Sequence, residues 1–291
     1  MSAVLILNPV AGEDAAPEYL THILAKLSPR FGVVDVAITA KGGDASLAAR
    51  EAVASGCEYL FIAGGDGTLN EALNGVAAVE AGFDRVTLGL LPLGTGNDFA
   101  NAINIPAEPD AALDLLVTAT ARKFDVGRLD DRVFINVSAG GFVADVSDAV
   151  DSSLKSLAGR FAYLIGGAKV LLGAEPFECH VNGRARSCLM FAVCNAPMFG
   201  GGRLIAPDAA PDDGALDVCL VGAMSLLEFV GLLRRVASGS HVTDERVTYF
   251  AAREVDLAFD REVRVNTDGE VFSAASCHYG VLAGAARVLA P

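Results

Sequence analysis

The sequence predicts an α/β protein with two domains, an N-terminal layered α/β domain and a C-terminal antiparallel β sandwich. Three observations lead to this prediction. The chain has 291 residues and is 52% hydrophobic, which is enough to bury one large core or two ordinary ones. Strands and helices alternate as far as Gly127, and from Arg132 onward strands predominate. We therefore predict domains at residues 1–127 and 128–280, and the sequence leaves open whether residues 281–291 return to the first domain.

In the first half, short apolar runs indicate strands, and apolar residues at helical spacing indicate helices. The predicted strands are residues 4–7, 33–39, 59–63 and 86–92, and the predicted helices are residues 17–27, 44–55, 68–79, 97–103 and 108–117. Strands that alternate with helices favour a parallel sheet in a layered domain.

The second half is dominated by strands, with two helices between them. The predicted strands are residues 132–138, 177–181, 185–193, 216–221 and 254–259. Asn182-Gly183 is typical of a hairpin turn. One helix is predicted over residues 154–172, and a second begins with a capping box formed by Ser225 and Glu228. We expect the two halves to pack closely, with a cleft between them.

The acidic composition excludes some classes of partner. The net charge is −14 and the pI is near 4.6, so no nucleic acid partner is expected. No apolar run approaches the roughly 20 residues of a membrane-spanning helix, and the N-terminus does not resemble a signal peptide. We expect a cytoplasmic protein whose cysteines are buried free thiols. A peripheral, transient contact with the inner membrane and a dimeric state both stay open.

The segment FIAGGDGTLNEALN, residues 61–74, has the features of a phosphate-binding loop. An apolar strand leads into glycines and then into a helix, whose N-terminal N–H groups attract anions. No lysine of a Walker loop and no dinucleotide fingerprint accompany it. Asp66 would repel a polyphosphate unless a divalent cation stood between them, and Mg²⁺ prefers such oxygen ligands.

Other oxygen ligands follow neighbouring strands of the predicted sheet. Asn97 and Asp98 come after the strand at 86–92, Asp125 lies in a later strand, and the first strand ends at Asn8. Open α/β sheets bind ligands at these strand ends. The alternative is that each residue is an ordinary turn or cap residue. Their occurrence at several strand ends of one sheet favours a functional site.

Six motifs together resemble the soluble bacterial diacylglycerol kinase family, which is related to the sphingosine and ceramide kinases. They are NPVAG (8–12), GGDGTLNE (64–71), LGTGNDFA (93–100), FDVG (124–127), APDAAPDDGALDV (206–218) and VNTDGE (265–270). The resemblance covers nearly the whole chain. It implies an ATP-binding α/β domain, a β-sandwich domain that binds a lipid, and an ATP- and Mg²⁺-dependent lipid kinase that phosphorylates a hydroxyl of diacylglycerol or a related lipid.

The resemblance also implies roles for individual residues. The expected nucleotide-binding residues are Asn8, Thr39, Gly64, Gly65, Asp66, Gly67, Thr68, Thr95, Gly96 and Asn97. The expected metal ligands are Asp66, Asp98 and Asp125 for Mg²⁺, with Asp213 for a second, structural ion. Asp268 matches the general base for the acceptor hydroxyl, and Glu270 lies beside it. For Asp213 and for Asp268, an ordinary turn is the alternative reading.

Three departures from the family pattern weaken the cationic side of the ATP site. Glu13 and Asn101 stand where Lys and Arg are common, and Val271 stands where Pro is usual. Two other functions therefore stay open. One is an NAD kinase-like phosphotransferase, because NAD kinases share the GGDG loop. The other is a catalytically weak lipid-binding or carrier protein with the same fold.

Overall fold

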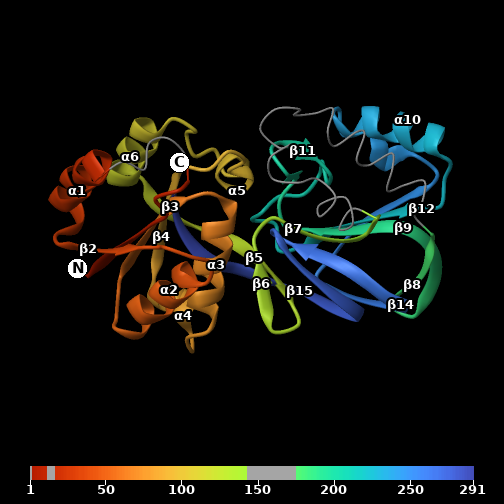
Figure 1. Ribbon diagram of the computed structural model, residues 1–291, viewed down its shortest axis with the longest axis horizontal. Helices are drawn as coiled ribbons and strands as arrows, with labels where there is room; N and C mark the ends of the chain where they lie inside the picture. Colours follow the sequence, from red (N-terminus) through yellow and green to blue (C-terminus); the bar gives the residue numbers. More distant parts are fainter. Residues whose placement is uncertain (1, 12–16, 143–174) are drawn as a thin grey trace.

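The computed structural model describes residues 2–11, 17–142 and 175–291 (Figure 1). The chain forms two lobes that lie side by side, one with helices on both faces of a sheet and one made mainly of strands. The predicted helix at 154–172 and Glu13 lie outside the described residues. In the described residues, no helix is long and apolar enough to span a membrane.

The first lobe is built on a parallel sheet, as the alternating pattern predicted. The strand order is β2-β1-β3-β4, so β2 lies at the edge of the sheet, and the later strands β3 and β4 lie toward its centre. Its strands are β1 (Ala3–Leu7), β2 (Val34–Ile38), β3 (Tyr59–Gly64) and β4 (Thr87–Pro92). Nearly every residue of β3 and β4 is buried, which explains their continuous apolar sequences.

Helices cover both faces of this sheet (Figure 1). Helices α1 (Pro17–Phe31) and α6 (Pro109–Thr118) pack together on one face, and α2 (Asp44–Ala54), α3 (Asp66–Ala77) and α4 (Gly82–Arg85) lie on the other. The short helix α5 (Asp98–Ala102) follows β4. Since α3 and α5 start directly beyond β3 and β4, their first residues lie at one edge of the sheet.

The second lobe is antiparallel and is built around two apolar clusters. Its strands are β6 (Arg132–Phe134), β7 (Val137–Gly141), β8 (Phe177–Val181), β9 (Arg184–Cys194), β12 (Leu216–Gly222), β13 (Val247–Ala252) and β14 (Glu254–Thr267), with a small hairpin of β10 (Met198–Phe199) and β11 (Arg203–Leu204). Asn182 and Gly183 form the predicted turn between β8 and β9, both with positive φ. One cluster lies among the strands, and the other includes Phe229 and Leu232 of α10 (Leu226–Val236).

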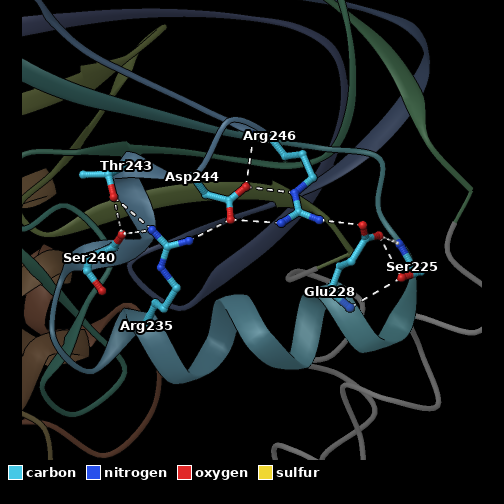
Figure 2. Close-up of polar contacts among 7 residues, drawn as sticks. All are labelled: Ser225, Glu228, Arg235, Ser240, Thr243, Asp244 and Arg246. Carbon is cyan, nitrogen blue, oxygen red and sulfur yellow. Dashed lines mark hydrogen bonds and ion pairs between the residues drawn. The ribbon is translucent and has the colours of Figure 1, made fainter.

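A network of charged side chains fastens α10 to the loop before β13, which contains the short helix η1 (Ser240–Thr243) (Figure 2). Ser225 and Glu228 form the predicted capping box. Arg246 contacts Glu228 at 2.7 Å and Asp244 at 2.8 Å, and Arg235 contacts Asp244 at 2.8 Å. Hydrogen bonds from Arg246 lower the pKa of Asp244 to about 2. These contacts hold α10 against the loop before β13.

Two long strands run from one lobe into the other. They are β5 (Thr120–Leu129) and β15 (Glu270–Ala290), which pair with each other. β15 begins as the partner of β14 and ends parallel to β4, where Arg287 is opposite Thr87. The last residues of the chain therefore complete the sheet of the first lobe.

Candidate active site

The loops after β3 and β4 approach each other so closely that glycine is required. A Cβ on Gly94 would lie 2.5 Å from the Cα of Gly65. The N–H of Leu93 also donates to the carbonyl of Gly64 at 3.0 Å. A small, mainly apolar pocket lies beside these loops, lined in part by Gly64, Gly65 and Asp66. The closeness of the two backbones leaves no room for bulky side chains where these loops meet.

The ends of β1 and β2 lie beside the same loops. Asn8 donates from Nδ2 to the hydroxyl of Thr68 at 2.9 Å. A Cβ on Gly64 would lie 2.6 Å from that hydroxyl, so the turn fits closely around it. Thr39 is buried, and its N–H donates to the carbonyl of Leu7 at 2.9 Å. The structure thus brings Asn8 together with the glycine loop.

Asp66 is the first residue of α3 and is partly exposed. Its carboxylate accepts from the N–H groups of Asp98 and Phe99 at 3.1 and 3.3 Å. A third bond comes from Nδ2 of Asn136 at 3.2 Å. Burial raises the pKa of Asp66, the hydrogen bonds from the N–H groups of Asp98 and Phe99 oppose that increase, and the charge of Asp98 adds to it. A carboxylate has about four lone-pair sites, so three donors leave room for one more partner.

Asp98 joins this edge to the second lobe. Its two carboxylate oxygens accept from the N–H groups of Gly201 and Gly202 at 3.0 and 2.8 Å. Gly96 lies between the two acids, because a Cβ there would be 3.1 Å from Asp66 Oδ2 and 3.9 Å from Asp98 Oδ2. The loop between β10 and β11 is therefore held against the start of α5.

Asp268 reaches the same place from the turn between β14 and β15. Its carboxylate accepts from the N–H groups of Ile135 at 2.6 Å, Val137 at 2.9 Å and Asn136 at 3.2 Å. Burial raises its pKa to about 6, the three N–H groups oppose that increase, and the charge of Asp66 adds to it. At neutral pH the carboxylate is ionised yet close to its pKa, as a general base requires.

The other predicted residues do not join this group in the same way. Glu270 is exposed and forms an ion pair with Arg132 at 3.2 Å. Asn97 makes both of its side-chain hydrogen bonds to Gly94, so it stabilises its own turn. Gly67 and Thr95 are exposed beside the glycine loops. The predicted nucleotide and catalytic roles of these residues stay predictions.

Asp125 and Asp213 lie in a different setting. Asp125 is 2% exposed, and its oxygens accept from the N–H groups of Gly214 and Gly284, both at 2.6 Å. Asp213 is exposed and accepts from the N–H of Ala215 at 2.9 Å, which is a local turn. Across residues 2–11, 17–142 and 175–291, no three His, Cys, Asp or Glu side chains converge as a ready-made metal site. The four acids predicted as metal ligands are thus not gathered together.

The sequence reasoning missed Asn136 and Asn195, which connect the acids. Asn195 donates from Nδ2 to the carbonyls of Asp125 and Ile135 at 3.1 and 2.9 Å. Residues 132–138 were predicted as one strand, but the strand is interrupted between β6 and β7, where the N–H groups turn to Asp268. A polar Asn136 within an apolar run was the available signal.

The two lobes match two known family models. Residues 2–129 match the family model of the diacylglycerol kinase catalytic domain, and residues 135–290 match the YegS C-terminal NAD kinase beta sandwich-like domain. The chain is 32% identical to the diacylglycerol kinase of Bacillus subtilis (strain 168) over 273 residues, covering 92% of this chain and 89% of that one. It is 33% identical to the enzyme of Staphylococcus aureus (strain Newman) over 272 residues, covering 92% and 85%.

A solved structure from Bacillus anthracis str. Sterne, described as a candidate diacylglycerol kinase, superposes with a TM-score of 0.83 at 25% identity, covering 100% of this chain and 95% of that one. Fold, site and relatives define a two-domain kinase that acts on an alcohol group. The chain belongs to the diacylglycerol kinase family.

Proposed function

We propose that this protein transfers the terminal phosphoryl group of ATP to a hydroxyl of diacylglycerol or a related lipid. One observation carries the proposal: Asp66 of the glycine loop and Asp268 of the second lobe are joined through a single residue, Asn136. Phosphoryl transfer depends on positioning and charge stabilisation rather than on covalent chemistry. A carboxylate near the phosphates and a carboxylate near the acceptor hydroxyl would supply the groups that such a reaction needs.

The glycine loops fit the phosphates of ATP. A Cβ on Gly96 would lie 3.1 Å from Oδ2 of Asp66, and a Cβ on Gly94 would lie 2.5 Å from the Cα of Gly65, so side chains at these positions would crowd the loops. Backbone N–H groups at the start of α3 are suited to anions. In this proposal Asn8 and Thr68, which are hydrogen-bonded to each other, stand at the nucleotide side of the edge.

The donor set also fits a single Mg²⁺ that arrives with the nucleotide. Mg²⁺ in such sites usually takes one or two carboxylates and completes its coordination with phosphate oxygens and water. Two neighbouring acids, Asp66 and Asp98, meet that need although no cluster of three acids occurs among the described residues. When bound, the ion would neutralise charge on the phosphates. Asp98 would have to exchange its hydrogen bonds to Gly201 and Gly202.

Asp268 is the group we assign as general base. Three N–H donors fix its carboxylate and leave about one lone-pair site for the acceptor hydroxyl. The base would accept the hydroxyl proton as the oxygen attacks the terminal phosphorus of ATP, whose bond to the bridging oxygen breaks to release ADP. Since diacylglycerol resides in membranes, the protein would act at a membrane surface.

The test follows transfer of radiolabelled phosphate from ATP to diacylglycerol in mixed micelles, with Mg²⁺ present or chelated. We expect product with Mg²⁺, little product without it, and a loss of about 100-fold or more in Asp268→Asn. NAD serves as a second acceptor, because the second lobe matches a sandwich domain named for NAD kinase. Transfer to NAD and not to lipid, or lipid binding without transfer, would contradict the proposal.

A further inference from the structure

Asn136 stands between the two acids of the site, in the two-residue break between β6 and β7. Its backbone N–H donates to the carboxylate of Asp268, and its side-chain Nδ2 donates to Oδ1 of Asp66, both at 3.2 Å. Asp66 belongs to the first lobe and Asp268 to the second. One residue thereby sets the separation of two carboxylates that come from opposite lobes.

The orientation of this amide follows from chemistry. An ionised carboxylate can only accept hydrogen bonds, so the nitrogen of Asn136 must face Asp66 and the oxygen must point elsewhere. That oxygen is buried and has no hydrogen-bond partner in the part of the chain that the structure describes. An unpaired buried acceptor is destabilising. Stability alone therefore does not account for an asparagine here.

The backbone of Asn136 is held independently of its side chain. Its carbonyl accepts from the N–H groups of Asn195 and Ala196 at 2.8 and 3.2 Å. A substitution at position 136 consequently keeps the N–H group that faces Asp268, and it removes the contact with Asp66. This separation allows the side-chain role to be tested by itself.

We propose that Asn136 is a positioning residue, whose side-chain amide holds the Asp66 carboxylate in register with Asp268 for phosphoryl transfer. The proposal rests on the function proposed above. Without the amide, Asp66 keeps only the two bonds from Asp98 and Phe99, which come from its own lobe. The alignment of the two lobes at the reacting groups is then lost.

The chain offers a matched control in Asn74 of α3. Its Nδ2 donates to the carbonyl of Val133 at 2.9 Å, and its Oδ1 accepts from the N–H of Val133 at 3.1 Å. Asn74 therefore connects the same two parts of the molecule, α3 and β6. In the described part of the chain, the hydrogen bonds of its side chain go to Asn70 and Val133, and none goes to Asp66 or Asp268. Asn74→Ala removes a structural amide at the same junction without touching the acids.

The experiment compares Asn136→Ala, Asn136→Asp and Asn74→Ala in the full chain. For Asn136→Ala we expect kcat to fall about 10- to 100-fold, the size of one hydrogen bond to a charged group, with KM for lipid within about threefold. Calorimetry should show about tenfold weaker binding of ATP with Mg²⁺, because Asp66 is displaced. Asn136→Asp keeps the shape and places a second carboxylate against Asp66, so a larger loss is expected.

Asn74→Ala should lower the melting temperature while kcat and ATP affinity stay within about threefold of the wild type. The inference is overturned if Asn136→Ala keeps its kcat, or if Asn74→Ala loses as much activity as Asn136→Ala. Should the wild type phosphorylate no lipid, the proposed function fails, and calorimetry still decides the role of Asn136. Equal ATP affinity in the wild type and both Asn136 variants, or no ATP binding at all, would then overturn it.

Discussion

Asp66 and Asp125 are acids of two neighbouring regions, and they are held in different ways. Asp66 is partly exposed at the glycine loops, and its hydrogen bonds measure 3.1 to 3.3 Å. Asp125 is almost fully buried, and two N–H groups bind it at 2.6 Å. Gly214 and Gly284, which supply those groups, come from segments far apart in the chain. The comparison teaches that acids in similar motifs can differ in solvent access and in hydrogen-bond donors, and we expect only the more accessible one, Asp66, to be free to bind a ligand.

The largest effect is expected for Asp66→Asn. The substitution removes the negative charge of the carboxylate that we propose binds the cation. We therefore expect kcat to fall about 1,000-fold, the upper range for loss of one electrostatic contact. Asn at position 66 would set an NH₂ group against one of the N–H donors, but burial raises the pKa of Asp66, so losing the charge offsets part of that cost and the melting temperature should fall less than in Asp125→Asn. Phosphate transfer and thermal melting measure both. If Asp66→Asn kept a tenth of the wild-type activity, the proposed difference in role between Asp66 and Asp125 would be contradicted.

Asp125→Asn tests the other half of the comparison. The amide would place an NH₂ group against one of the two N–H donors, so the free energy of unfolding should fall by about 3 to 5 kcal/mol. Denaturant titration at neutral pH measures the change. Asp213→Asn is the control, because that exposed side chain makes one local hydrogen bond and should cost about 1 kcal/mol or less. Equal losses in the two variants would contradict the fastening role.

The pH dependence sharpens the role of Asp268. Its pKa is raised to about 6, so kcat/KM should fall about tenfold per pH unit as the pH drops below that value. The effect on stability has the opposite sign. Because the folded pKa exceeds the unfolded value of 3.8, the folded state binds the extra proton between these values, and this group contributes most stability at low pH. A rate profile that is flat down to about pH 5 would exclude Asp268 as the base.

The smallest effect is expected at α10, where Glu228 and Asp244 form ion pairs with Arg246 and Arg235 (Figure 2). Ser225→Ala removes the hydroxyl that caps the helix at Glu228, so the free energy of unfolding should fall by about 1 kcal/mol. Lipid phosphorylation should be unchanged. Denaturant unfolding and a phosphate-transfer assay on the same preparation check both statements. A loss of activity would show that α10 affects the site.

The fold was largely predictable because its signals are local. Buried strands such as β3 are apolar throughout, and Asn182-Gly183 permits the tight turn between β8 and β9. Asp44 shows the limit of such signals: Asp before an apolar periodic run predicts a helix cap at that position, yet Asp44 is the first residue of α2 and the cap is Gly43. The return of the chain end to β4 could not be derived, since strand pairing over that distance leaves no local pattern.

The site was predictable to a lesser degree. The glycine loops and Asp66 follow from the rule that strand ends in open sheets bind ligands. Asp98 and Asp125 have similar sequence surroundings. Only the structure shows that their carboxylates accept hydrogen bonds from the N–H groups of Gly201 and Gly214, respectively. Asn136 was missed because an interrupted strand and a continuous one have the same apolar pattern.

One consequence follows from the strand β15, which begins among the sandwich strands and finishes beside β4. The halves of this enzyme are not independent modules that could be produced or exchanged separately. A fragment that stops before residue 280 would leave β4 with an open edge, and such edges recruit other chains. Truncation at the tail is therefore expected to cause aggregation of the first lobe, although most of that lobe lies in the first half of the sequence.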